Sequence, residues 1–261
     1  MQNKKERIAG RLRAAGIEAA AFEAAQLCTL AEAQIPAAVE KRIAGVPLQY
    51  ILGEWEFYGL TFYVGEGVLI PRPDTEILVE QALCFLKDRP GANVLELCAG
   101  SGCVAVTIAK YADAAVTAVE LSPQAFCYLQ KNIALHSVPV QAVQGDLFAG
   151  VAGAFDLILA NPPYIRTGEL DALSREVKHE PMLALDGGSD GLRFYRAIAE
   201  LYRDNLAAGG RLLLEIGYDQ RAEVTAILAG AGYQNIICFR DYGGNDRVIS
   251  AEKQGATYNG I

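Results

Sequence analysis

The 261-residue chain is poor in the residue types on which several kinds of catalytic site depend. Its only histidines are His136 and His179, which gives little support to a histidine-based triad. Its six cysteines form no CxxC pair and have no histidine at metal-ligand spacing, so we expect no zinc or other metal site. Scattered thiols of this kind are usually reduced, which predicts a cytoplasmic protein.

Basic residues and long apolar runs are also scarce. Lys and Arg number 23 against 31 Asp and Glu, for a formal net charge of −8, so we expect no direct binding to nucleic acid. No apolar run approaches the length of a transmembrane helix, and the charged start MQNKKERIAGRLRAAG lacks the apolar core of a secretory signal. These absences predict that the protein has no membrane partner.

Apolar residues, at 52%, are plentiful enough for a well-buried core, and their pattern divides the chain into three parts. Residues 1–52 place apolar and charged residues at helical spacing, which predicts a small helical domain. Residues 53–75 are rich in aromatic and β-branched residues with glycine turn signals, which predicts a β-hairpin linker. Residues 76–261 form the third part, and we expect Asp74 to cap its first helix.

From about Asn93 the chain alternates between strands and helices. The candidate strands are 94–97, 115–120, 140–143, 155–160, 211–216, 235–239 and 247–251. The first five are separated by helical or long loop segments, which is typical of a doubly wound α/β sheet. Only the turn-rich stretch RDYGGND joins the last two, so we expect them to pair antiparallel. A mainly parallel sheet with a terminal antiparallel hairpin is the Rossmann-like pattern of class I methyltransferases.

A glycine-rich turn follows the first candidate strand. Its residues are Cys98, Ala99, Gly100, Ser101 and Gly102. Glycines at a strand-to-helix turn let a ligand approach the backbone, and the helix N-terminus presents free amides. The next strand ends in Glu120, which can accept hydrogen bonds from both ribose hydroxyls of a nucleoside cofactor. Because residues 100–105 also fit G-x-G-x-x-A, this loop alone leaves S-adenosylmethionine and a nicotinamide or flavin cofactor open.

Two further polar residues stand at the ends of later strands. Asp146, followed by Leu147, can bind an adenine amino group while its apolar neighbours cover the ring, although an aspartate that caps the next segment fits equally well. Asn161 ends the fourth strand. Since the carboxyl ends of parallel strands converge on one crevice, we expect both residues to lie close to Gly100 and Glu120.

Residues 161–164, the NPPY turn, suit the grip of a planar NH2 group. Two successive prolines cannot continue a central strand, so the chain must turn there. The Asn161 side-chain oxygen and the Pro162 backbone carbonyl can each accept one N–H, and the Tyr164 ring can pack on the flat face of the group. The plain alternative is an ordinary Pro-Pro turn that closes a strand.

Six blocks of the sequence resemble peptide chain release factor glutamine methyltransferases in order and spacing. They are PLQYILGEWEFYGLTFYVGEGVLIPRPDTEILVE (47–80), ELCAGSG (96–102), FDLILANPPYI (155–165), HEPMLALDGGSDGL (179–192), LLLEIGYDQ (212–220) and DYGGNDRV (241–248). Tetrapeptides of NPPY type occur in many amino-directed methyltransferases. The block YILGEWEF…VLIPRPDTE is more specific, because nucleic acid enzymes with NPPY do not normally carry it.

The resemblance implies transfer of a methyl group from S-adenosylmethionine to the side-chain amide nitrogen (N5) of the glutamine in the GGQ motif of class I release factors, with S-adenosylhomocysteine as the product. It implies that the helical domain meets the release factor. The implied cofactor-binding residues are Cys98, Ala99, Gly100, Ser101, Gly102, Glu120, Asp146, Leu147 and Asn161. The implied substrate-binding residues are Asn161, Pro162, Pro163, Tyr164 and Arg72, of which Asn161, Pro162 and Tyr164 are the implied catalytic group.

The chain departs from the commonest family pattern at a few positions. Cys98 and Ala99 stand where Gly and Thr are frequent, Glu96 and Glu120 replace Asp, and Leu147 takes a place that is often aromatic. None of these changes removes a group that the chemistry needs. The side chain of Cys98 stands where a backbone approaches a ligand, so we expect altered backbone torsion angles and an inert thiol there.

Three other functions are possible for a sequence of this kind. An N6-adenine or N2-guanine nucleic acid methyltransferase shares the grip on an NH2 group, but the net charge and the absence of an Arg- and Lys-rich segment argue against it. A non-catalytic cofactor-binding protein needs no acceptor site, and the intact NPPY turn weakens that reading. An NAD-dependent oxidoreductase needs a His or Tyr-Lys pattern that Tyr195 and Arg196 do not supply; we expect these two in a helix.

Overall fold

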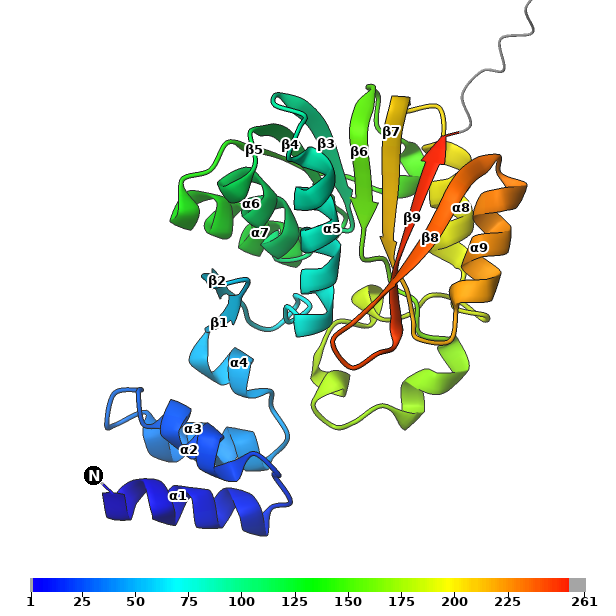
Figure 1. The fold of residues 1–261 in the computed structure, drawn as a ribbon. Coiled ribbons are helices and arrows are strands. Elements are labelled where there is room, and N and C mark those ends of the chain that lie inside the picture. Colours follow the sequence, from blue (N-terminus) through cyan, green and yellow to red (C-terminus); the bar gives the residue numbers. More distant parts are fainter. Residues whose placement is uncertain (1, 254–261) are drawn as a thin grey trace, which may run out of the picture.

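The computed structural model describes residues 2–253, in which a group of short helices precedes a seven-stranded sheet covered by helices on both faces (Figure 1). The helices are α1 (Gln2–Ala14), α2 (Ala20–Leu27), α3 (Ile35–Ile43) and α4 (Leu48–Leu52). They have an apolar cluster of their own, in which Leu12, Leu27 and Val39 are almost wholly buried. This cluster forms because apolar residues recur at helical spacing in each segment. Figure 1 shows the helices beyond the sheet end to which β6 and β7 point.

A short hairpin follows the helices. Its strands β1 (Glu54–Phe57) and β2 (Leu60–Tyr63) pair antiparallel, as the glycine turn signals predicted. Phe57 and Phe62 point into the main core, where both are buried.

The prediction that Asp74 caps the next helix is wrong. The turn η1 (Pro73–Thr75) leads directly into α5 (Glu76–Leu86), and neither element has a side-chain cap. Asp74 instead forms an ion pair with Arg247 at 3.3 Å, from the far end of the described chain. A long-range charge contact has therefore replaced the local contact that the sequence suggested.

The main sheet has the strand order β5-β4-β3-β6-β7-β9-β8. Its strands are β3 (Ala92–Leu97), β4 (Ala114–Glu120), β5 (Val140–Gln144), β6 (Phe155–Ala160), β7 (Leu206–Glu215), β8 (Tyr233–Arg240) and β9 (Asp246–Lys253). The first five are parallel, and β9 lies antiparallel between β7 and β8. The predicted parallel sheet with a terminal antiparallel hairpin is confirmed. The order reverses between β3 and β6, which is where such sheets form a crevice.

The two faces of the sheet are covered by different helices. On one face, α5, α6 (Cys103–Tyr111) and α7 (Pro123–His136) share an apolar cluster with Leu157 and Leu159 of β6. On the other, α8 (Arg193–Leu201) and α9 (Arg221–Gly230) share a cluster with Ile158 and Ala160. Successive residues of one strand thus enter opposite layers, which is why the central strands read as continuous apolar runs.

Between β6 and α8 the chain runs across the carboxyl end of the sheet as loops and short turns. These turns are η3 (Thr167–Ala172), η4 (Val177–His179) and η5 (Met182–Ala184). An ion pair of 2.5 Å joins Glu176 of this segment to Arg42 of α3, a residue that also pairs with Glu23. The helical part therefore contacts the segment that follows the NPPY turn.

Candidate active site

Polar residues and glycines gather at the carboxyl ends of the parallel strands. A cleft of about 1160 Å³, counted out to its open mouth, lies there. The predicted site residues in its lining are Arg72, Cys98, Ala99, Gly100, Ser101, Glu120, Asp146, Leu147, Asn161 and Pro163. Three others, Gly102, Pro162 and Tyr164, do not line it among the described residues.

The glycine turn after β3 has a backbone that most side chains would strain. Cys98, Gly100 and Gly102 have φ angles of +58°, +55° and +78°, all in the left-handed region. A Cβ atom on Gly100 would meet nothing within 4 Å, which leaves its backbone open to an approaching ligand. A Cβ atom on Gly102 would lie 2.3 Å from Leu129 Cδ1, so the packing of α6 against α7 requires that glycine.

Glu120, at the end of β4, connects the glycine turn to the next loop. Its Oε2 accepts a hydrogen bond from the Gly100 backbone N–H at 2.8 Å, and its Oε1 accepts one from the Ser122 N–H at 2.7 Å. Burial raises the pKa of this carboxyl in spite of these amides. Because a carboxylate offers about four lone-pair positions, two are left for hydroxyl donors in the cleft. This geometry fits the two ribose hydroxyls of a nucleoside.

Asp146 caps a short turn and also faces the cleft. Its Oδ1 accepts a hydrogen bond from the Phe148 N–H at 2.9 Å and so caps η2 (Leu147–Ala149), as the alternative reading of the sequence proposed. Beside it, the Phe148 ring centroid lies 5.7 Å from that of Phe194 and 4.9 Å from the Arg193 guanidinium carbon. These groups give the cleft an aromatic wall next to the carboxyl, which suits a planar ring.

Asn161 directly follows the last residue of β6, and a hydrogen bond holds the NH2 side of its carboxamide. Its Nδ2 donates a hydrogen bond to Thr75 Oγ1 at 3.2 Å, and its Oδ1 has no hydrogen-bond partner in residues 2–253. Because the NH2 group is engaged, the oxygen is the atom available to a ligand. The structure thus presents an acceptor where the sequence predicted a grip on an NH2 group.

Tyr164 is fixed by the chain behind it. Gln220 Nε2 donates to the Tyr164 backbone carbonyl at 3.0 Å. A Cβ atom on Gly187 would lie 2.7 Å from Tyr164 Cα, and one on Gly191 would lie 2.4 Å from the Tyr164 carbonyl oxygen. The glycines of DGGSDG therefore let two stretches of backbone touch. Burial, followed by the charge of Glu215, raises the pKa of the Tyr164 phenol to about 12.

Arg72 borders the cleft in a fixed position. Its guanidinium forms an ion pair with Glu180, a residue that is 4% exposed. Glu180 also accepts a hydrogen bond from the Ile70 N–H at 3.0 Å. The linker and the segment after the NPPY turn are joined at this point, and a positive charge is held at the edge of the cleft.

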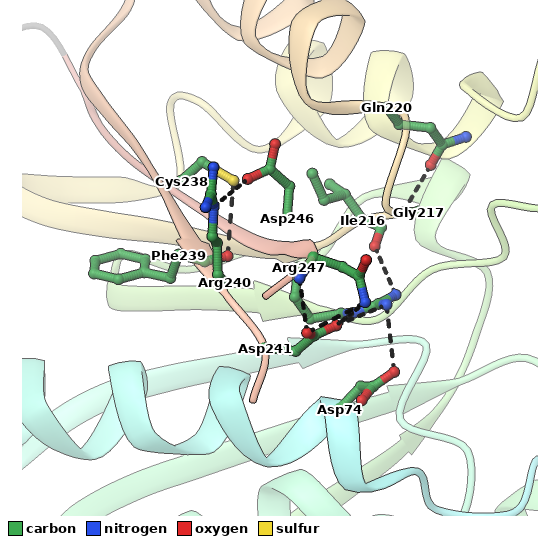
Figure 2. A network of polar contacts seen from close by, with 11 residues as sticks. Asp74, Ile216, Gly217, Gln220, Cys238, Phe239, Arg240, Asp241, Asp246 and Arg247 are labelled. Atoms are coloured by element: carbon green, nitrogen blue, oxygen red, sulfur yellow. Dashed lines mark hydrogen bonds and ion pairs between the residues drawn. The ribbon is translucent and has the colours of Figure 1, made fainter. Parts of the chain in front are cut away.

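A second arginine stabilises the neighbouring end of β7 (Figure 2). Arg247 donates to the Asp241 carboxylate from Nε at 3.2 Å and from Nη2 at 3.0 Å, and to the Ile216 carbonyl from Nη1 at 3.2 Å. Its pairing with Asp74 brings the start of α5 to the same place. Three segments that are distant in sequence therefore meet beside the NPPY turn.

Two further buried carboxyls lie in this region. Glu96 of β3 accepts a hydrogen bond from the Ala105 N–H at 2.9 Å, and burial raises its pKa to about 8. Glu215, the last residue of β7, is 1% exposed, and burial raises its pKa to about 7. Burial also raises the pKa of the Cys98 thiol, which favours its protonated form near neutral pH.

Three residues that shape the site were not predicted from the sequence. Thr75 and Gln220 bond directly to Asn161 and Tyr164, and Glu215 lies behind them. All three belong to blocks that carry the family resemblance, PRPDTE and LLLEIGYDQ, and that was the available signal. Tyr195 and Arg196 do lie in a helix, α8, where Tyr195 is buried and Arg196 pairs with Asp190.

Neither a cluster of metal ligands nor a membrane-spanning helix occurs in the part of the chain that the structure describes. No group of three or more His, Cys, Asp or Glu side chains in residues 2–253 could hold a metal ion. None of the helices in that range is both long and apolar enough to cross a membrane. All six cysteines are free thiols.

Comparison with solved structures identifies the fold. A methyltransferase from Pyrococcus furiosus is 23% identical and has a TM-score of 0.59, with 85% of this chain and 98% of that chain covered. A 16S rRNA N2 G1207 methyltransferase from T. thermophilus, solved with AdoMet and guanosine, is 22% identical with a TM-score of 0.55, covering 77% and 50%. The likeness shows that the sheet is that of class I S-adenosylmethionine-dependent methyltransferases.

Sequence comparison is more specific. The model of the methyltransferase small domain matches residues 73–184. The release factor glutamine methyltransferase of Fusobacterium nucleatum is 43% identical over 79% of this chain, which spans 60% of that protein's length. Those of Geobacter sulfurreducens and Cereibacter sphaeroides are 45% and 43% identical over 81% and 87% of this chain, and 75% and 81% of their own lengths are covered. This chain therefore belongs to the family of release factor glutamine methyltransferases.

Proposed function

We propose that this protein transfers a methyl group from S-adenosylmethionine to the side-chain amide nitrogen N5 of the glutamine in the GGQ motif of class I release factors, and so modulates translation termination. The observation that carries the proposal is the Asn161 carboxamide. Its NH2 group is engaged by Thr75 and its oxygen is available, at the edge of a cleft whose other half is built for a nucleoside. The names of the relatives support the same activity.

The residues of the cleft fit S-adenosylmethionine. The open backbone at Gly100, the Glu120 carboxyl and the wall formed by Leu147 and Phe148 would hold its ribose and adenine parts, with Asp146 near the adenine amino group. When bound, the cofactor supplies an electrophilic methyl group on a sulfonium centre. The departures at Cys98, Ala99 and Leu147 leave this fit intact, because the turn keeps its open backbone.

The acceptor nitrogen needs positioning more than activation by a base. An amide nitrogen is a weak nucleophile because its lone pair is delocalised into the carbonyl. Correct orientation of two reacting groups can lower a barrier by about 7–11 kcal/mol. Asn161 Oδ1 and the Pro162 carbonyl would accept the two N–H bonds of the glutamine, and both acceptors would favour the positive charge that develops on nitrogen. Pro163 lines the cleft. Tyr164, which does not line it as the described residues form it, would have to turn its ring toward the cleft to pack on the flat face of the amide.

The release factor would approach from the side of the helices. We divide the chain into a helical substrate-binding domain (1–52), a β-hairpin linker (53–75) and a methyltransferase domain (76–261). The Arg42–Glu176 ion pair supports this role, because it couples the helices to the segment that borders the NPPY turn. The exposed Leu183 of that segment lines the cleft, as Arg72 does, and offers an apolar contact there, with the exposed Met182 next to it in sequence. Translation takes place in the cytoplasm, so the reaction would occur there.

Labelled methyl transfer tests the proposal. The purified protein is incubated with labelled S-adenosylmethionine and one of three acceptors: a class I release factor, the same factor with its GGQ glutamine replaced by alanine, or bulk DNA and RNA. Label should appear only on the unaltered release factor. Undiminished label on the alanine variant would move the acceptor to another residue. Label on nucleic acid would support the N6-adenine or N2-guanine alternative.

A further inference from the structure

Glu215 is a buried carboxyl that the proposed reaction does not yet use. It is 1% exposed, and its Oε2 has no hydrogen-bond partner within residues 2–253. A buried carboxyl without full pairing costs stability, so such a group needs an explanation. Its place in the sheet is informative, because Leu214 is the register partner of Ala160 on β6. Glu215 and Asn161 are therefore the next residues on two neighbouring strands.

Thr75 connects these two residues. Its Oγ1 accepts the hydrogen bond from Asn161 Nδ2 at 3.2 Å, and its side chain lies close enough to the Glu215 carboxyl to lower that carboxyl's pKa. A hydroxyl has one proton to give, and Thr75 does not use it on Asn161 because it is the acceptor there. The proton can therefore go to Glu215. The result is a chain of donors that runs from Asn161 through Thr75 to Glu215.

The direction of this chain decides what Asn161 presents to the cleft. A carboxamide turned by 180° would offer two N–H donors in place of an oxygen, and donors would repel the NH2 group of a glutamine. An acceptor on the Thr75 side holds the carboxamide in the productive orientation. A negative charge at the end of the chain strengthens both hydrogen bonds, since charge-assisted bonds are roughly twice as strong as neutral ones.

We propose that Glu215 is a positioning residue for the methyl transfer: through Thr75 it fixes the Asn161 carboxamide with Oδ1 toward the substrate amide, and its negative charge favours the positive charge that develops on the substrate nitrogen. This inference rests on the proposed function of the site. It assigns a role to a residue of β7 that neither touches the substrate nor lines the cleft as the described residues form it.

The protonation state of Glu215 makes the proposal measurable. Burial raises its pKa to about 7, while Thr75, Arg247 and Arg72 act in the opposite direction. The titratable or charged groups that face it are Arg72, Asp74, Cys103, Tyr164, Tyr195 and Arg247. The two tyrosines and the cysteine stay neutral near pH 7, because burial raises the pKa of each one. The charge of Glu215 is thus the one in this group that changes near neutrality, and kcat should rise with pH through about 7.

The test compares wild type with Glu215→Gln, which keeps the shape and an acceptor for Thr75 but removes the charge. We expect kcat to fall about 10- to 100-fold, which is less than the roughly 100- to 1,000-fold loss on removal of one direct donor, because Glu215 acts through Thr75. The KM for the release factor and the affinity for S-adenosylhomocysteine, measured by calorimetry, should change less than twofold. The rise of kcat with pH should disappear. Glu252→Gln, on β9, is the matched control and should keep the wild-type profile.

A second pair of variants acts on the link itself. Thr75→Val should lose as much kcat as Glu215→Gln, Thr75→Ser should recover most of it, and the double variant Thr75→Val with Glu215→Gln should lose no more than either alone. Thr107→Val, a buried threonine that bonds only within α6, controls for packing. In NMR spectra, the Asn161 NH2 signals should shift with pH near 7 in wild type and stay constant in Glu215→Gln.

The outcomes separate the inference from the proposed function. If wild type does not label the release factor, the proposed function fails, whatever the variants do. If wild type labels it and folded Glu215→Gln keeps both its kcat and its pH profile, the positioning role is overturned. Should Glu215→Gln not fold, equal activities of Thr75→Val and Thr75→Ser would overturn it, and a loss in the valine variant alone would support it.

Discussion

The two halves of the cleft are built in different ways. The nucleoside half is local: Glu120 bonds to backbone amides of Gly100 and Ser122, and the turn owes its shape to left-handed residues. The acceptor half is assembled from side chains of separate segments, with Asn161 of the NPPY turn, Thr75 before α5 and Glu215 of β7 in one chain of contacts. One half depends on backbone conformation and the other on the chemistry of particular side chains. Substitutions in the nucleoside half should therefore lower the affinity for the cofactor, whereas those in the acceptor half should lower the rate of methyl transfer.

Asn161→Ala should have the largest effect, because it should impair the acceptor half and leave the nucleoside half intact. We expect methyl transfer to the release factor to fall by two or more orders of magnitude, a loss of about 3 kcal/mol or more in transition-state stabilisation. Binding of S-adenosylhomocysteine, measured by calorimetry, should change little, because the nucleoside half is intact. Wild-type turnover in this variant would remove Asn161 from the mechanism.

Each half also holds a buried carboxyl with a strongly raised pKa, Glu96 in the nucleoside half and Glu215 in the acceptor half, and both make stability depend on pH. Burial raises their folded-state pKa values to about 8 and about 7. The folded state then keeps protons that the unfolded state releases, so the contribution of these groups to stability is greatest below the unfolded pKa of 4.5 and falls as pH rises toward 8. At about 1.4 kcal/mol per pKa unit, the loss between pH 5 and pH 8 should be on the order of 3 kcal/mol for Glu96 and somewhat less for Glu215. Chemical denaturation of Glu96→Gln and Glu215→Gln at pH 5 and pH 8 checks this. A slope as steep as in wild type would contradict it.

The two glycines of the turn distinguish ligand contact from packing. Gly102→Ala should destabilise the fold by about 1–3 kcal/mol, since its Cβ atom would meet Leu129 at 2.3 Å. Gly100→Ala should cost only about 1 kcal/mol in stability, because its backbone is left-handed. It should nevertheless weaken the binding of S-adenosylhomocysteine more than Gly102→Ala does. Thermal unfolding and calorimetry measure the two effects. The opposite ranking in affinity would place the ligand elsewhere.

The smallest effect is expected at Cys98. Its φ of +58° is unusual for a residue with a side chain, and Cys98→Gly should relieve that strain. The variant also loses apolar contacts, so the net change in stability should stay within about 1 kcal/mol. Affinity for S-adenosylhomocysteine should be unchanged. A large loss of affinity would show that the thiol itself contacts the ligand.

The contrast between the halves also explains what the sequence could predict. The strands, the terminal hairpin and the strand-end residues Glu120 and Asn161 follow from local patterns, and the structure contains all of them. The contacts of Thr75 and Glu215 do not follow, because they depend on which strand lies beside which. The prediction that Asp74 caps a helix was wrong for the same reason. Its ion-pair partner, Arg247, is distant in the sequence, and no local pattern indicates that the two residues meet.

The position of β9 has a consequence for how the molecule is made. This strand is the last of the sheet in sequence, yet it lies inside, between β7 and β8. It carries Arg247, whose partner Asp74 is more than 170 positions earlier in the chain. Contacts of such long range form late in folding, since loop closure must precede them. On a ribosome, the glycine turn and the NPPY turn emerge before β7 and β9, so an incomplete copy of this enzyme has the residues of the nucleoside half while Asn161 and Thr75 still lack Glu215 and Arg247 behind them.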